Sequence, residues 1–513
     1  MEYQQRLTTP VRMRATGTIL LTLLVLQACT TWSPSRQPLP QLLEQKPGSA
    51  LKVVRTDLST HDVRDAWISG DSLRGRRMPG NTDFAVPLTE IRSVEVRRVS
   101  TGRTVMLVAG LGITAAIVAA AISDDDPPPQ QEAPVTSCPL VYAWDGTDWR
   151  LDSGTFGGAI TRALQRTDVD NLDFARPVDG ILRLKVTNEL SETDHLDALH
   201  VLAVDHEPGV TLVPDAGGHL HTIGSLSLAV RAVDYGGRDA LARVSQSDGW
   251  NWESIPTGRN ASRASDVRDG LELTFIRPAG AQSAHLVLDG NNTPWAAYML
   301  HQFVEAHGSA TDAWYDSLNA RPAYAMAMQE RLAREAFLSA SLSTADGWTQ
   351  QGIFWEAGPE IVKRQVMHLD LTGVTGDTVR VRLESVPSFW MIDRVAIEYG
   401  LDRPFTVTRL EAVTARDHRG EDVAARINAV DDIYHVLETG DAAEVHFRVP
   451  PVSAGSVRSY LLSSTGWYQV HTSRADEPDI ATLRQVLEGP LGISRASVER
   501  LNKALHVMQT ASH

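Results

Sequence analysis

The sequence has little cysteine, few aromatic residues and fewer basic than acidic side chains. Two cysteines among 513 residues exclude a disulfide-rich scaffold and a four-cysteine zinc site. Lys and Arg number 48 against 63 Asp and Glu, which gives a formal net charge of −15. A chain with this charge repels phosphate backbones, so nucleic acid is not expected as a partner.

The short motifs of common enzymes are also missing. The chain has no Gly-x-Ser-x-Gly elbow, no His-Glu-x-x-His helix and no glycine-rich phosphate loop. Glu356, Glu360 and Asp370 could serve as acids, but nothing in the sequence pairs them as a glycosidase dyad. We therefore identify no catalytic residue and favour a non-catalytic protein. An envelope enzyme of unknown reaction is an alternative.

What the sequence does contain is a long series of strand patterns. With 513 residues and 42% hydrophobic side chains, the chain is long enough for several hydrophobic cores. Apolar and polar residues alternate between turn signals spaced eight to twelve residues apart, which is typical of β-sandwiches. We predict a mainly β, multidomain protein of β-sandwich units, with a small N-terminal β module, one apolar helix and a helical insert.

Changes in composition and periodicity divide the chain into ten predicted segments. They are a signal peptide (1–28), a tether (29–48), a small β module (49–103), an apolar helix (104–123), a linker (124–136), a β-sandwich domain (137–293), a helical insert (294–338), a jelly-roll-like β unit (339–400), a C-terminal β unit (401–475) and a C-terminal helix (476–513). The uncharged run 105–122 is open to three interpretations: a helix that dips into a membrane or packs on a second copy, a true membrane span, or a buried helix.

The N-terminus has the pattern of an export signal. Three arginines within the first 14 residues precede an apolar stretch from Ile19 to Leu26, which is too short to span a bilayer and suits a signal peptide. The stretch ends in Leu-Gln-Ala-Cys29. This ending resembles the lipobox of bacterial lipoproteins, in which the signal is cleaved before a cysteine that is then diacylated. An ordinary signal peptide with an incidental cysteine is the alternative.

The lipobox resemblance implies that Cys29 is lipidated and that membrane lipid is a partner, because two or three acyl chains hold a protein stably on a membrane. It also implies a lipid-anchored protein of the cell envelope. Thr30 follows the cysteine where Asp would signal inner-membrane retention, so the outer membrane is favoured over the inner. Cys138 then lacks a partner, and its apolar surroundings predict a buried structural thiol.

Histidines and aspartates gather in the predicted strands of the middle region. They are His195, His200, His206, His219, His221, Asp194, Asp197 and Asp205. Some could converge on paired strands and bind a metal such as zinc. Their spacing matches no metal-site signature, so we assign no metal ligand and no cofactor. The acidic run 168–173 alternates oxygen ligands but lacks the pattern of a calcium loop, and a solvated turn and a helix cap are expected there.

Tryptophans are the residues that most suggest a ligand. The segments KRQVMHLDL, DTVRVRLES and FWMIDRVAIEYG resemble part of a galactose-binding-like jelly roll near residues 335–400, a fold that often hosts sugar stacking on aromatic rings. We take Trp348 and Trp355 as candidate ligand-binding residues. We expect a cell-envelope lipoprotein with a structural or binding role and an envelope protein or glycan as partner, and carbohydrate binding as the alternative function.

The lipid anchor is directly testable by metabolic labelling. The wild-type chain should incorporate radiolabelled palmitate, because acylation requires the Cys29 thiol, and the labelled protein should be recovered in the membrane fraction of the cells. The Cys29→Ala variant should lose both the label and the membrane association. Equal labelling of the two proteins would contradict the lipoprotein interpretation.

Overall fold

The computed structural model describes residues 30–34, 39, 43, 50–55, 60–78, 82–99, 139–254, 263–355, 357–487 and 489–511. The chain is mainly β, with 47% strand against 20% helix, and the predicted fold class is confirmed. Within these residues, no helix combines the length and the apolar character needed to cross a membrane. Cys29, Cys138 and the segment 104–123 lie outside the described residues.

The N-terminal module is one antiparallel sheet in the strand order β1-β6-β2-β3-β4-β5. Its strands are β1 (Thr30–Pro34), β2 (Leu51–Arg55), β3 (Thr60–Ser69), β4 (Ser72–Met78), β5 (Thr82–Pro87) and β6 (Ile91–Val99). Alternate apolar side chains turn to one face, where Val53, Val63, Leu73 and Val86 form a buried cluster. These strands belong to one of the two compact units of the chain, which also includes residues 248–250 and 504–513.

The first β sandwich has one sheet in the order β25-β27-β10-β7-β8 and another in the order β24-β11-β28-β9, with β26 also paired to β11. Its strands are β7 (Leu140–Trp144), β8 (Trp149–Gly154), β9 (Arg166–Asn171), β10 (Ile181–Thr187), β11 (Glu192–His206), β24 (Phe405–Leu410), β25 (Ala412–Asp417), β26 (His435–Leu437), β27 (Ala442–Arg448) and β28 (Val457–Val470). The sheets therefore combine two segments that are far apart in the chain.

The second β sandwich is formed by the residues between those two segments. One sheet has the order β14-β23-β18-β21, with β16 paired to β23, and the other has the order β15-β17-β22-β19-β20. The strands are β14 (Ser227–Leu228), β15 (Arg231–Asp234), β16 (Trp252–Glu253), β17 (Asp269–Ile276), β18 (Ser283–Asn292), β19 (Leu338–Thr344), β20 (Gly347–Phe354), β21 (Lys363–Asp370), β22 (Thr378–Ser385) and β23 (Trp390–Glu398). The predicted segment 137–293 thus supplies strands to both sandwiches.

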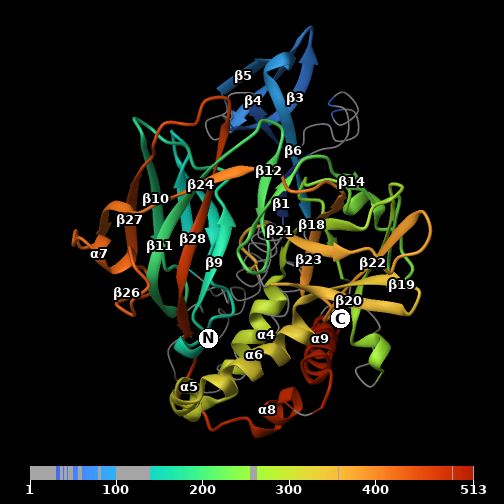
Figure 1. Ribbon diagram of the computed structural model, residues 1–513, viewed down its shortest axis with the longest axis vertical. Coiled ribbons are helices and arrows are strands. Elements are labelled where there is room, and N and C mark those ends of the chain that lie inside the picture. Colours follow the sequence, from blue (N-terminus) through green and yellow to red (C-terminus); the bar gives the residue numbers. More distant parts are fainter. Residues whose placement is uncertain are drawn as a thin grey trace, which may run out of the picture. The chain divides into compact units, whose positions relative to one another are not determined.

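A hairpin connects the sandwiches and covers one face of the second. It consists of β12 (Thr211–Pro214) and β13 (Leu220–Ile223), and Figure 1 shows β12 between the strands of the two sandwiches. Val213 and Ile223 pack against Val287 and Val366 of β18 and β21. Because this contact is apolar and fully buried, it fixes the hairpin on the sheet.

Three residues of β18 lie on the face below the hairpin, and each has one cross-strand neighbour on β21 and one on β23. His285, Val287 and Asp289 project to that face, since they are two residues apart. Their direct cross-strand partners on β21 and β23 are His368 and Glu398, Val366 and Ala396, and Arg364 and Arg394. The face therefore has an apolar middle between a histidine-rich end and an ionic end, at which Asp289 binds Arg364 and Arg394.

Helices occupy most of the segment 294–338, whose last residue already begins β19, and they pack with the C-terminal helices below the sandwiches (Figure 1). The helices are α4 (Pro294–Glu305), α5 (Thr311–Ala320), α6 (Pro322–Ala336), α8 (Ile480–Leu487) and α9 (Gly492–Ala511). Trp295 of α4 donates to Ser497 Oγ of α9 at 2.9 Å. Glu335 of α6 accepts from the Ser494 backbone N–H, which has no intrahelical partner in the first turn of α9.

Candidate functional site

A polar cavity of about 350 Å³ lies where the two β sandwiches meet. Edge strands of both sandwiches form its walls, β9 on one side and β21 on the other, and α6 and the turn of the β12–β13 hairpin complete it. The charged and amide side chains that line it are Gln165, Arg166, Asp168, Asp170, Asp215, Gln329, Lys363, Arg364 and Gln365. Trp355, one of the two predicted ligand-binding residues, is also in the wall.

A buried ion cluster joins the two walls. Lys363 Nζ of β21 lies 3.1 Å from Asp168 Oδ2 and 3.2 Å from Asp170 Oδ2, both on β9. Ser153 Oγ also donates to Asp170. The Lys363 and Asp170 side chains are only 7% and 8% exposed, so neither charge is solvated by bulk water and each depends on the other.

The two carboxylates of this cluster respond differently to burial. Burial and the neighbouring charge of Asp168 raise the pKa of Asp170 to about 6, although Lys363 opposes the shift. Burial would also raise the pKa of Asp168, but the charges of Lys363 and Arg166 outweigh it and lower that pKa. The acidic run 168–173 was expected to form a solvated turn and a helix cap, and this expectation was wrong. Its first half is edge strand β9 (Arg166–Asn171), because Asp168 and Asp170 alternate onto the face that meets Lys363.

Two hydrogen-bond donors in the cavity wall have no acceptor among the described residues. These atoms are Nε of Arg166 and Nε2 of Gln329, and both are buried. A buried polar atom without a partner costs free energy, so such atoms in native proteins usually have a bound water or ligand. Trp355 lies next to them, with the Arg166 guanidinium 4.9 Å from its ring centroid. The side-chain amide of Gln365 holds the Trp355 backbone through two hydrogen bonds.

Trp348, the second predicted ligand-binding residue, lies elsewhere. It is on β20 in the outer sheet of the second sandwich, opposite Ser343 of β19. Arg382 lies over its ring at 4.0 Å from the centroid, and Glu272 holds Arg382 in turn at 2.7 Å. The structure therefore does not bring Trp348 and Trp355 together, and an arginine already occupies one face of the Trp348 ring.

The predicted histidine group separates into residues with different partners. His195 stacks on Trp467 with ring centroids 3.8 Å apart, and burial lowers its pKa to about 4. His200 is hydrogen-bonded to the Asn428 carbonyl oxygen, and His206 to Ser459 Oγ. His219 is exposed and pairs with Asp215.

His221 alone of these histidines lies in a cluster of residues that could bind a metal. Its neighbours there are His285 and Asp402. Sequence reasoning missed both, because neither is close to His221 in sequence. The alternation of His285 with apolar residues in the segment HLVLD was the one available signal.

Comparison with known proteins assigns no function to the cavity or to the histidine cluster. The chain matches no protein-family model, and no curated protein is significantly similar to it. The function therefore has to be argued from the residues of the cavity and of the histidine cluster.

The ion cluster predicts a large effect for a single substitution. Replacing Lys363 with Met leaves Asp170 buried without its cation and leaves Asp168 only the more distant Arg166, at 3.7 Å. The substitution should lower the free energy of unfolding by about 3–5 kcal/mol. Urea denaturation followed by tryptophan fluorescence measures this. Lys503→Met, at an exposed position of α9, is the control and should change little. A Lys363→Met protein as stable as the wild type would refute the structural role of the cluster.

Asp152, which is close to Asp170, predicts an unusual dependence of stability on pH. Burial raises its pKa from 3.8 to about 7, even though it accepts backbone N–H groups of Asp173 and Phe174. Between these two values the folded state binds more protons than the unfolded state, so this group makes stability fall as pH rises from about 4 to about 7. Asp152→Asn should remove that contribution, whereas Asp179→Asn, at an exposed site whose charge does not act on Asp152, should not. Urea midpoints measured across this range test the difference, and parallel curves for wild type and Asp152→Asn would contradict it.

Proposed function

We propose that the protein is a non-catalytic binding protein of the cell envelope that takes a neutral, hydroxyl-rich ligand in the cavity between its two sandwiches. Carbohydrate is the leading class of ligand. The observation that carries the proposal is a cavity wall that combines cationic, amide and carboxylate side chains, with two unpartnered donors, Arg166 Nε and Gln329 Nε2, buried behind its surface. Sugar hydroxyls both donate and accept hydrogen bonds, so they suit a wall that offers both kinds of group.

The charge balance of the cavity favours a neutral ligand over an ionic one. Three cationic side chains and three carboxylates line it: Arg166, Lys363, Arg364, Asp168, Asp170 and Asp215. The volume of about 350 Å³ is in the lower part of the range of small-molecule sites. The indole of Trp355 adds an apolar surface, as sugar rings require for their C–H faces.

The pairing of two of the three cavity acids with one lysine favours binding over glycoside hydrolysis. Asp168 and Asp170 are two residues apart on one edge strand and share Lys363 as their counter-ion. A glycosidase needs two carboxyl groups that flank the scissile bond from opposite sides. The proposed place in the envelope is supported by the lipobox resemblance, with membrane lipid bound through acylated Cys29.

A glycan array probed with the full chain, followed by calorimetry on the best ligand, tests this function. Gln329→Leu removes one donor at similar side-chain volume and should weaken binding about tenfold, the value of one hydrogen bond. Trp348→Ala, outside the cavity, should bind as the wild type does. The proposal fails if no glycan binds, or if Trp348→Ala abolishes binding while Gln329→Leu has no effect.

A further inference from the structure

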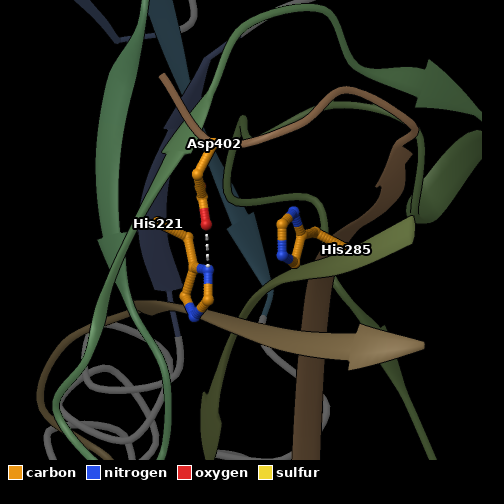
Figure 2. A group of neighbouring side chains, drawn as sticks. All are labelled: His221, His285 and Asp402. Carbon is orange, nitrogen blue, oxygen red and sulfur yellow. Dashed lines mark hydrogen bonds and ion pairs between the residues drawn. The ribbon is translucent and has the colours of Figure 1, made fainter. Parts of the chain in front are cut away.

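Three side chains from separate elements converge beside the β12–β13 hairpin. His221 is on β13, His285 is on β18, and Asp402 is in the loop between β23 and β24. His221 Nδ1 lies 2.9 Å from Asp402 Oδ2, and the rings of His221 and His285 are 4.6 Å apart. Figure 2 shows the imidazole of His285 directed at the His221–Asp402 pair from the opposite side. One ligand atom from each residue falls within 4.8 Å of the other two.

The fold places these residues through two-residue alternation. Ile223 of β13 packs on Val287 of β18 in the apolar middle of the face. His221 and His285 are each two residues before those partners, so they continue the same faces of their strands. The apolar contact between hairpin and sheet therefore brings the two imidazoles together.

His285 has a buried ring nitrogen without a hydrogen-bond partner among the described residues, which is a second, independent observation. Its side chain is buried, with 7% of the residue exposed, and no described residue offers its Nδ1 atom a hydrogen bond. A buried ring nitrogen in this state loses the hydration it has in the unfolded chain. A bound ion beside Asp402 would restore that interaction.

The other two side chains are held in place by their surroundings. Asp402 Oδ1 accepts the backbone N–H of Thr222 at 2.7 Å, which ties the loop to β13. Asp215 Oδ2 lies 3.5 Å from His221 Nε2 on the far side of that ring. A metal ion on His221 Nδ1 would replace the direct contact with Asp402, and Asp215 beside Nε2 would then orient the ring, as an outer carboxylate commonly does for metal-binding histidines.

Two further side chains that could bind a metal lie beside His285 on its own sheet. His368 is its direct neighbour on β21, with ring centroids 5.7 Å apart, and its side chain is exposed. Glu398 is its direct neighbour on β23, and Glu398 Oε2 is buried without a hydrogen-bond partner among the described residues. Three imidazoles and two carboxylates therefore gather at one end of this face.

We propose that His221, His285 and Asp402 bind a divalent transition metal ion, with His368 as a fourth ligand. Two or three imidazoles with one carboxylate suit zinc and its neighbours in the first transition row, whereas calcium and magnesium prefer sites of oxygen only. Ligand atoms in a zinc tetrahedron are about 3.3 Å apart. The ligand atoms here lie within 4.8 Å of one another, so binding would shorten the longest of these distances. Asp402 and His368 have room to do this because they are exposed.

The clustered ligand atoms and the buried, unpartnered Nδ1 of His285 carry this assignment. The site is distinct from the polar cavity, and the inference does not rest on the proposed function.

Zinc titration of the metal-free full chain tests the inference. Calorimetry, or competition with a chromophoric chelator, should show one Zn²⁺ bound per chain, and Co²⁺ should give the visible bands of a tetrahedral site. His285→Gln should lower the Zn²⁺ affinity about 100-fold or more, since even outer-shell substitutions lower metal affinity about 10- to 100-fold. Zn²⁺ should also raise the thermal midpoint of the wild type but not that of the variant.

The matched control is His446→Gln. His446 also pairs with a carboxylate, Glu444, at 2.7 Å, but it is not among the clustered metal-binding groups of the described residues. This variant should bind Zn²⁺ as the wild type does. If His285→Gln does not fold, Asp402→Asn at the more exposed position replaces it and should show the same loss. Absence of stoichiometric Zn²⁺ binding, or equal binding by wild type and both cluster variants, overturns the inference.

Discussion

The ion cluster of Lys363 with Asp168 and Asp170 is the interaction on which the arrangement of the two sandwiches depends. It joins an edge strand of the first sandwich to an edge strand of the second. Burying three charges is unfavourable unless their geometry is well satisfied, so the cluster permits little freedom in how β9 meets β21. The polar cavity exists because these two edges meet through charges and not through a continuous apolar contact.

The β12–β13 hairpin contributes to both candidate sites. Asp215, in its turn, lines the cavity and also lies beside His221. The apolar pairing of the hairpin with β18 and β21 holds the turn over the cavity and the histidine over the sheet. A ligand in the polar cavity and an ion at the histidine cluster would therefore both contact the β12–β13 hairpin.

The local structure of this chain was more predictable than its pairing. Alternation and turn residues indicated the strands, and periodicity indicated the helices of the insert, because these signals depend on neighbours in sequence. Trp355 lies in the cavity wall, while its role in ligand binding stays a prediction, and the wall residues Lys363 and Gln329 carry no motif. His285 and Asp402 were not identified, because they approach His221 only through an apolar contact between distant strands.

The insertion of the second sandwich into the first has a consequence for how the chain folds. β11 pairs with β28 from His206↔Val457 to Glu192↔Val470, so its partner is synthesised only after the whole inserted sandwich. Until then β11 and β10 offer open edges, which are sites of mispairing. The Asp402–Thr222 hydrogen bond holds the two ends of the insertion together. Once the inserted sandwich has formed, it shortens the effective loop that the first sandwich must close.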